Sequence, residues 1–178
     1  MTGLAAFTAL VALVGLERLA ELVVSRSNAA WSMARGGRES GLGHYPVMVA
    51  LHTGFLAAML VEAWLRRPDV PAGLAWTALA LVVVSQALRW WCIATLGRRW
   101  NTRVIVVPGL PPVTSGPYRL LRHPNYVAVV VEGLALPLVH AAWITALVFT
   151  LANAALLTVR IRTEDAALAT LPRSSVDA

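Results

Sequence analysis

Long apolar runs alternate with short polar segments along almost the whole chain. The apolar runs span residues 4–24, 45–64, 73–96, 126–140 and 141–159. A helix needs about 20 apolar residues to cross the roughly 30 Å hydrocarbon core of a bilayer. The pattern therefore predicts an all-α integral membrane protein with about five transmembrane helices, arranged as a single membrane domain over residues 1–178.

The last two apolar runs follow each other almost without interruption. Only the sequence LPLVH at residues 136–140 lies at their junction, which is too short for a water-exposed loop. A proline interrupts helical hydrogen bonding, so we expect Pro137 to mark the break. The sequence thus predicts a tight helical hairpin whose turn lies at the membrane interface.

The arginines between the apolar runs predict an orientation, because cytoplasmic loops of membrane proteins have an excess of Arg and Lys. With five helices, one side of the membrane would hold Arg26, Arg35, Arg38, Arg98, Arg99, Arg103, Arg119, Arg122, Arg160, Arg162 and Arg173. The opposite side would hold only Arg66 and Arg67. We therefore expect the N-terminus outside and the C-terminus in the cytoplasm.

The composition agrees with a membrane location and argues against nucleic acid as a partner. Hydrophobic residues make up 58% of the chain and charged residues 13%, against about 25% charged in a typical soluble domain. The net charge is +6, but the arginines lie in short clusters between apolar runs, where they meet anionic head groups of membrane lipids. The Ala- and Arg-rich composition suggests a high-GC bacterium, and hence its inner (plasma) membrane.

The least membrane-like stretch lies between Gly97 and Pro124. It contains a β-branched run at 104–107, followed by the sequence PGLPP at 108–112. Such a run, bounded by Pro and Gly, predicts a strand or hairpin. Loops of this length in compact proteins are usually functional. We therefore expect a site on the cytoplasmic surface here.

Three motifs occur in sequence order from the end of this stretch onward. They are Gly116-Pro117-Tyr118, Arg122-His123-Pro124-Asn125-Tyr126 and, one hairpin later, Arg160-x-x-x-Glu164-Asp165-x-x-Leu168. Residues 97–168 resemble the isoprenylcysteine carboxyl methyltransferase family, whose members show Gly-x-Tyr, Arg-His-Pro-x-Tyr and Arg-x-x-x-Glu-Glu-x-x-Leu around a terminal helical hairpin. The resemblance implies a membrane O-methyltransferase that uses S-adenosylmethionine.

The chemistry of these residues fits such a site. Pro124 suits the first turn of a helix, so His123 lies at the helix entrance. The free backbone N–H groups there suit a carboxylate, such as that of the methionine moiety of the cofactor. Arg160 and Glu164 are four residues apart and share one helical face. The glutamate can accept from an amine or a ribose hydroxyl, and the arginine can hold an anionic substrate oxygen.

The resemblance also implies particular contacts. Cofactor contacts would be made by Leu110, Val113, Tyr118, His123, Pro124, Asn125, Tyr126 and Glu164. Catalytic roles would fall to His123 and to Arg160, which would face the substrate. Where the family often has two glutamates this chain has Glu164-Asp165, so Asp165 receives no role, and no metal is implied. Simpler interpretations remain: His123 could only cap a helix, and Arg160 with Glu164 could form an ordinary interfacial salt bridge.

Polar residues inside the apolar runs form a second group. They are Glu17, Arg18, Glu21, His52, Glu62, Gln86, Arg89 and Glu132. Charge at such depth is costly and tends to face a partner or a cavity. Glu17 and Glu21 could join Arg18 or Arg89 in a structural cluster or line a substrate pocket. His52 and Glu132 are predicted to be polar groups of that pocket.

Two kinds of lipophilic acceptor fit the expected methyl transfer. A prenylcysteine carboxylate is ionised at neutral pH and needs no base. A phenolic lipid, such as an alkylresorcinol or alkylpyrone, ionises near pH 10 and would need a base such as His123, His52 or Glu132. Farnesylated proteins are not expected in a bacterium, so the phenolic lipid is favoured.

Two other functions are compatible with the sequence. Membrane reductases of the sterol-reductase type use NADPH and share an Arg-His-Pro-Asn-Tyr string. They usually place a glutamate very soon after the tyrosine, whereas the next glutamate after Tyr126 here is Glu132. A non-catalytic scaffold or a small transporter would bind neither cofactor. The sequence leaves the oligomeric state open.

Overall fold

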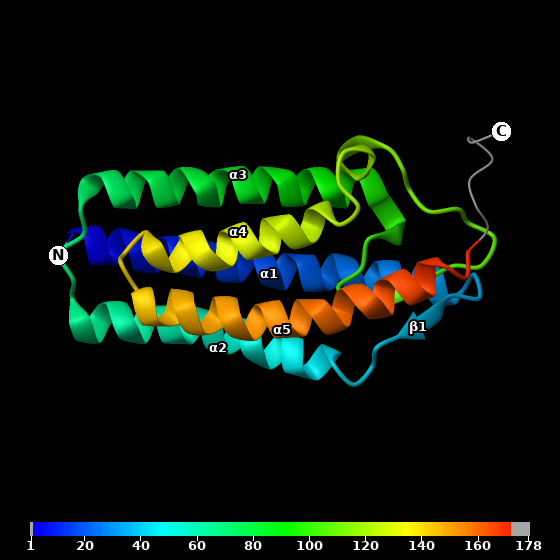
Figure 1. Cartoon of the computed structure of the whole chain (residues 1–178), viewed down its shortest axis with the longest axis horizontal. Helices are drawn as coiled ribbons and strands as arrows, with labels where there is room; N and C mark the ends of the chain where they lie inside the picture. The colour runs from blue at the N-terminus through cyan, green and yellow to red at the C-terminus, as the bar shows by residue number, and fades with distance from the viewer. Residues whose placement is uncertain (1, 172–178) are drawn as a thin grey trace.

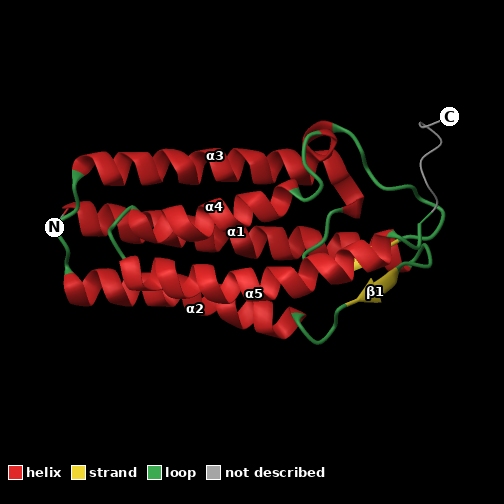
Figure 2. Cartoon of the chain, viewed as in Figure 1, coloured by secondary structure: helices red, strands yellow, loops and turns green. Residues whose placement is uncertain are grey.

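Five α-helices lie side by side along the long axis of the molecule (Figure 1). The computed structural model describes residues 2–171. In that part of the chain the helices are α1 (Thr2–Met33), α2 (Tyr45–Arg66), α3 (Ala72–Leu96), α4 (Pro124–Leu138) and α5 (Trp143–Leu168). The short elements gather at one end (Figure 2): strands β1 (Arg38–Ser40) and β2 (Val104–Val106), and the single 3-10 turns η1 (Gly97–Arg99) and η2 (Gly116–Arg119).

The helix lengths show which segments can cross a bilayer. Three helices of the described chain are long and apolar enough to do so, at Tyr45–Arg66, Ala72–Arg99 and Trp143–Leu168. Helix α4 is apolar but has 15 residues, or about 22 Å at 1.5 Å per residue. These helices confirm an integral membrane protein with a helical bundle, and the number of five spans stays a prediction.

Helix α1 continues to Met33, well past the predicted end at residue 24. Ser25, Asn28 and Ser32 in this extension are buried. Their spacing of three and four residues places them on one face of the helix. That face contacts the polar segment after α3, where Ser25 and Asn28 form hydrogen bonds. Hydropathy alone treats these residues as a loop, so the predicted end of the helix at residue 24 is too early.

The hairpin of α4 and α5 is present, but the prediction that Pro137 breaks it is wrong. Pro137 lies inside the last turn of α4, which ends at Leu138. A proline removes the hydrogen bond to the carbonyl four residues earlier and crowds that carbonyl, and α4 ends one residue after Pro137. The chain reverses instead around Ala141, whose φ of 51° is left-handed. A hydrogen bond of 2.9 Å from Ala142 N to Pro137 O closes the turn.

The run at 104–107 forms a strand, as predicted, but its partner was not foreseen. Strand β2 pairs antiparallel with β1, with Arg38 opposite Val106 and Ser40 opposite Val104. The β1 sequence Arg-Glu-Ser lacks the apolar alternation that signals a strand. This small sheet is therefore an addition to the expected all-α architecture, and it ties the segment after α1 to the segment after α3.

The hydrophobic core fills one half of the bundle. Its buried members are Phe7, Val11, Val14, Phe55, Met59, Ala63, Val82, Ala135, Leu136, Ala142 and Phe149. Most belong to the first half of α1, the second half of α2 and the turn between α4 and α5. That half lies at the end marked N in Figure 1, away from the strands. Val14, Phe55 and Phe149 of this core also line one of the two cavities described below, which extend from there toward the strands.

Glu62 of α2 caps the N-terminus of α5. Its carboxylate accepts hydrogen bonds from Ile144 N (3.1 Å), Thr145 N (2.8 Å) and Thr145 Oγ1 (2.8 Å). The first N–H groups of a helix have no partner within the helix, and the helix dipole favours a negative charge there. Glu62 therefore has a structural reason to lie among apolar residues.

We expect Glu62→Ala to lower the free energy of unfolding by about 2 kcal/mol, because two backbone N–H groups lose a charged acceptor. For a chain of this size, that loss corresponds to a fall in Tm of about 4–8 °C. Thermal unfolding in detergent measures it. Arg66 pairs with Glu62 at 3.2 Å but is largely exposed, so Arg66→Ala should cost less than half as much. Equal losses would assign the effect to the ion pair instead of the cap.

Candidate active site

Two cavities occupy the half of the bundle nearest the strands. The first, which we call the loop cavity, has a volume of about 470 Å³ and lies between the segment 99–118, the start of α4 and the end of α5. The second, the helix cavity, has a volume of about 630 Å³ and lies among α1, α2, α4 and α5, with Arg89 from α3. Both volumes are in the range of small-molecule sites.

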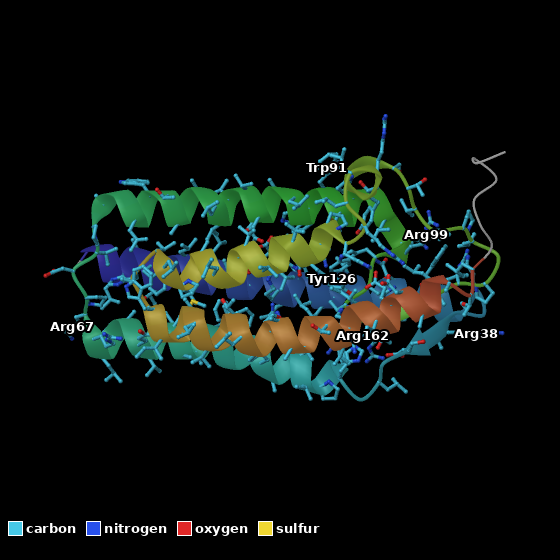
Figure 3. All side chains as sticks on the ribbon, viewed as in Figure 1. Arg38, Arg67, Trp91, Arg99, Tyr126 and Arg162 are labelled. Carbon is cyan, nitrogen blue, oxygen red and sulfur yellow. The ribbon has the colours of Figure 1, made fainter. Side chains whose placement is uncertain are left out.

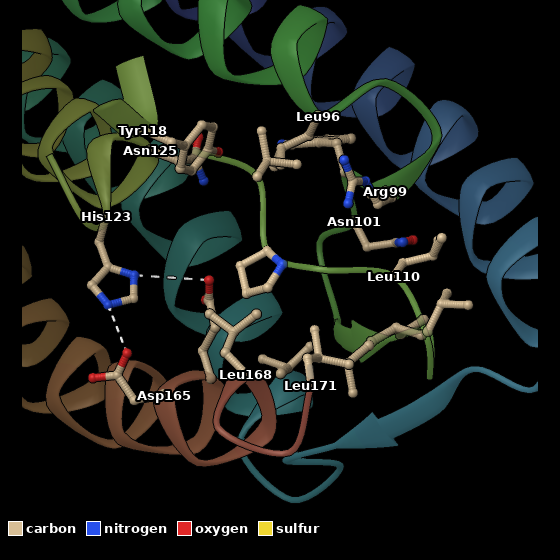
Figure 4. Close-up of a pocket in the computed structure, with 18 of the residues that line it drawn as sticks. Leu96, Arg99, Asn101, Leu110, Tyr118, His123, Asn125, Asp165, Leu168 and Leu171 are labelled. Carbon is tan, nitrogen blue, oxygen red and sulfur yellow. Dashed lines mark hydrogen bonds and ion pairs between the residues drawn. The ribbon is translucent and has the colours of Figure 1, made fainter. Parts of the chain in front are cut away.

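The loop cavity gathers most of the residues that the motifs singled out (Figure 4). Its lining includes Leu110, Val113, Tyr118, His123, Asn125, Tyr126 and Glu164. Pro124 does not line it, because Pro124 is buried at the start of α4. Apolar side chains from β2, the Pro-rich loop and the end of α5 complete the walls. The cavity therefore has one polar side and one apolar side.

His123 stands immediately before α4, where Pro124 begins the helix. Its Nε2 lies 3.0 Å from Asp165 Oδ1, and its Nδ1 lies 3.8 Å from Glu164 Oε1. The side chain makes no capping hydrogen bond to α4. His123 is the N-cap residue of α4 by position, but its imidazole does more than cap a helix, because it joins the start of α4 to the acidic pair on α5. The neighbouring Arg122 also pairs with Asp165, at 3.1 Å.

Tyr118 comes from η2 and reaches the cavity from the side of α3. Burial raises the pKa of the Tyr118 hydroxyl, and the nearby Cys92 thiol raises it further. The hydroxyl therefore stays protonated at physiological pH and acts as a neutral hydrogen-bonding group. Tyr118 thus adds polarity to the cavity without adding charge.

Tyr126, Arg160 and Glu164 form a chain of contacts at the base of the loop cavity. Arg160 Nε donates to the Tyr126 hydroxyl at 2.8 Å, and that hydroxyl donates to Glu164. Arg160 also donates from Nη2 to Thr102 O at 2.8 Å and contacts Met48 Sδ through Nη1 at 3.2 Å. Only 6% of Arg160 is exposed. Within the described chain Arg160 and Glu164 meet through Tyr126, so the interpretation of a direct interfacial salt bridge is wrong.

The two cavities share a boundary that we call the neck. It consists of the residues that line both cavities: Trp100, Asn101, Asn125, Tyr126 and Arg160. Three different segments contribute to it, namely the segment after η1, the first turn of α4 and the last part of α5. The two cavities are therefore direct neighbours.

The helix cavity is mostly apolar and opens at the surface of the bundle. Leu16 and Leu19 of α1 and Val49 and Thr53 of α2 line it and are exposed. In a bilayer this exposed surface faces lipid. Phe55 and Phe149, whose rings stack at 4.0 Å between centroids, also line it. The geometry suits a long apolar molecule that enters from the membrane.

One wall of the helix cavity has a buried network of ion pairs. Arg18 lies 2.6 Å from Glu21 and 2.9 Å from Glu132, and Arg89 lies 3.3 Å from Glu132. Gln86 joins the network through Arg18. Both of the sequence alternatives are present here, because these charges form a structural cluster and also line a cavity. Glu132 accepts hydrogen bonds from two arginines, Arg18 and Arg89.

His52, the other predicted polar group, also lines the helix cavity. Its Nδ1 lies 2.9 Å from Met48 O, and its ring meets Phe149 edge to face at 5.3 Å. Because a carbonyl can only accept, Nδ1 carries the proton and Nε2 is left as an acceptor. His52 therefore presents an acceptor nitrogen in this cavity.

Residues 100–102 lie in the stretch where a site was predicted, but none of them was named as a contact. Asn28 Nδ2 donates to Trp100 O at 2.8 Å, and Thr102 N donates to Ser25 Oγ at 2.9 Å. A signal was available, because Ser25 and Asn28 stand at helical spacing just beyond an apolar run. The neck depends on this contact between α1 and the segment after α3.

The chain is similar to known proteins over most of its length. Residues 78–170 match the model of the isoprenylcysteine carboxyl methyltransferase (ICMT) family. An uncharacterized protein, YpbQ, of Bacillus subtilis is 39% identical, over 91% of this chain and 96% of its own length. An uncharacterized protein of Haemophilus influenzae is 26% identical, over 88% of this chain and 92% of its own. No solved structure matches the chain.

Proposed function

The chain belongs to the isoprenylcysteine carboxyl methyltransferase family and is thus a membrane methyltransferase, and from this premise we propose that it methylates an oxygen of a lipophilic acceptor, using S-adenosylmethionine. The observation that supports the proposal most directly is the pair of cavities that share a neck. One cavity is polar on one side and reaches the loops, and the other is apolar and reaches the lipid-facing surface.

The residues of the loop cavity fit S-adenosylmethionine. Glu164 offers a carboxylate for an amine or a ribose hydroxyl, and the apolar wall with Leu110 and Val113 suits an adenine ring. Asn101 and Asn125 have buried amide atoms with no hydrogen-bond partner in residues 2–171. Unpaired buried polar atoms at a cavity are expected where a polar ligand binds. When bound, the cofactor supplies a methyl group activated by a sulfonium sulfur.

Arg160 is the group best placed to hold the acceptor. An acceptor oxygen in the helix cavity would form the new bond to the methyl carbon, while the carbon–sulfur bond breaks and its electrons stay on sulfur. Such a transfer needs alignment and exclusion of water more than covalent help from the protein. Arg160 is buried in the neck, and its guanidinium is fixed by Tyr126 and Thr102. It can therefore orient an anionic or polarised oxygen.

The acceptor that we favour is a phenolic lipid, such as an alkylresorcinol or alkylpyrone. Its hydroxyl must lose a proton during the transfer, unlike the prenylcysteine carboxylate that remains the alternative. His52, with Nε2 free to accept, is the proposed base. His123 lies in the loop cavity and already contacts Asp165, so we assign it to the cofactor side.

The arginines support a membrane orientation with the loop cavity facing the cytoplasm. Figure 3 shows Arg38, Arg99 and Arg162 toward the end with the strands, and Arg67 at the opposite end. The excess of arginine on one end follows the distribution typical of cytoplasmic faces. We propose five spans on this basis, with the N-terminus outside and the C-terminus inside the bacterial plasma membrane.

Calorimetry on the purified protein in detergent tests the cofactor assignment. We expect S-adenosylhomocysteine to bind with a micromolar dissociation constant and NADPH not to bind. Binding of NADPH alone would replace the methyltransferase proposal with the sterol-type reductase. Binding of neither would favour a scaffold or transporter. Mass spectrometry of lipids methylated by the enzyme would then identify the acceptor.

A further inference from the structure

The neck contains a polar side chain that none of the sequence motifs includes. Asn101 lines both cavities. Its Oδ1 and Nδ2 are both buried, and neither has a hydrogen-bond partner within residues 2–171. Leaving buried polar atoms unpaired is costly, and such atoms in a native protein call for an explanation. A role in binding explains why this amide is kept unpaired.

The residues on both sides of Asn101 are held by three helices, two of which bond the backbone. Asn28 of α1 binds Trp100 O at 2.8 Å, and Ser25 of α1 binds Thr102 N at 2.9 Å. Arg160 of α5 binds Thr102 O at 2.8 Å, and Tyr45 of α2 lies 3.3 Å from Thr102 Oγ1. The position of Asn101 is therefore fixed before any ligand binds, which is what a precise contact requires.

The other neck residues differ from Asn101 in what they can offer. The Tyr126 hydroxyl is shared by Arg160 and Glu164. Trp100 Nε1 is unpaired but can only donate. Asn125 has an unpaired Oδ1, and it lies in the first turn of α4. Asn101 is thus the neck residue in the described chain whose two amide atoms are both buried and unpaired.

We propose that Asn101 is a catalytic residue whose amide oxygen contacts the methyl sulfonium of the cofactor and directs the methyl group into the helix cavity. The inference rests on the proposed function, because it assumes S-adenosylmethionine in the loop cavity. The methyl group must pass through the neck to reach an acceptor in the other cavity. A positive sulfur polarises the methyl C–H bonds, and an amide oxygen accepts such weak hydrogen bonds. The contact would favour one direction of the methyl group, as an in-line transfer requires.

Two ligands separate this contact from general binding in the cavity. S-adenosylhomocysteine lacks the methyl group. Sinefungin instead has a carbon bearing an ammonium group in place of the methyl-bearing sulfur, so an oxygen facing the methyl position would accept a charge-assisted hydrogen bond from it. We expect Asn101→Ala to weaken the binding of sinefungin by about tenfold or more. The dissociation constant of the same variant for S-adenosylhomocysteine should change less than threefold.

Asn101→Asp and Ser115→Ala serve as controls in the same calorimetry. The aspartate retains the oxygen, so Asn101→Asp should bind sinefungin at least as tightly as the unmodified protein. Ser115 is exposed in the loop before η2 and lines neither cavity, so Ser115→Ala should leave both constants unchanged. Thermal unfolding of each variant checks that it folds.

The remaining outcomes have distinct meanings. If Asn101→Ala weakens both ligands equally, or neither, the oxygen does not face the methyl group and the inference is wrong. If Asn101→Asp weakens sinefungin as much as Asn101→Ala does, the amide N–H rather than the oxygen makes the contact, and the inference is again overturned. If the unmodified protein binds neither ligand, the proposed function itself fails.

Discussion

Replacing Arg160 with alanine is expected to lower the rate of methyl transfer by about 100-fold or more while leaving the protein folded. Losing one fixed donor at a reacting oxygen costs roughly 100- to 1,000-fold in rate. Arg160 is such a donor, because it is buried in the neck and fixed by Tyr126 and Thr102. The measurement is transfer of a labelled methyl group from S-adenosylmethionine into lipids extracted from the source membrane.

Two further variants make this prediction specific. Arg160→Lys keeps the charge but loses the planar fork that binds Tyr126 and Thr102 together, so it should remain severely impaired. Arg162 is exposed on the same helix, and Arg162→Ala should retain nearly full activity. The affinity for S-adenosylhomocysteine should fall less than about threefold in Arg160→Ala. A collapse of that affinity in parallel with the rate would show that Arg160 supports the cofactor cavity rather than the acceptor.

Replacing Glu164 with glutamine is expected to weaken S-adenosylhomocysteine binding by about 10- to 100-fold. A hydrogen bond to a charged group contributes about 1.5–3 kcal/mol, and the variant removes the charge while keeping the shape. Glu164 lines the loop cavity and accepts from Tyr126 on the side away from His123. Calorimetry gives the dissociation constant, and thermal unfolding should show a small change in Tm, because the side chain is partly exposed.

Glu39→Gln is the matched control for Glu164→Gln. Glu39 of β1 pairs with Arg103 at 3.3 Å on the surface near the same cavity, and pairs of this kind contribute little. The dissociation constant of Glu39→Gln for S-adenosylhomocysteine should therefore stay within about twofold of that of the unmodified protein. An unchanged constant in Glu164→Gln would remove Glu164 from the cofactor site. Equal losses in both variants would point to a long-range effect of charge.

The helices and the motif cluster could be predicted from the sequence because each rests on a local signal. Apolar runs place α2 and α3 to within a few residues, since hydropathy and helical span length act along the chain. The convergence of His123, Tyr126 and Glu164 on one cavity follows from motifs at both ends of a short hairpin. A tight hairpin brings the start of its first helix close to the end of its second helix.

The neck could not be predicted because it depends on contacts between distant segments. Asn101 stands between arginines that look like topology signals, and only its burial against α1 gives it significance. The strand at Arg38–Ser40 has no pattern of its own and forms only because β2 is beside it. Glu62 was predicted only to face a partner or a cavity, and its role as the cap of α5 is visible only once the two helices are packed. In each case the explanation lies in a partner far away in sequence.

The apolar core extends from the helix cavity toward the other end of the bundle, and this arrangement has an evolutionary consequence. Residues such as Leu16, Val49 and Leu156 border the helix cavity without belonging to the core, whereas Val14, Phe55 and Phe149 belong to both. The first three can be exchanged for larger or smaller side chains while the core keeps the helices together. A scaffold divided in this way lets a lineage adopt acceptors of new shapes without first having to gain stability elsewhere.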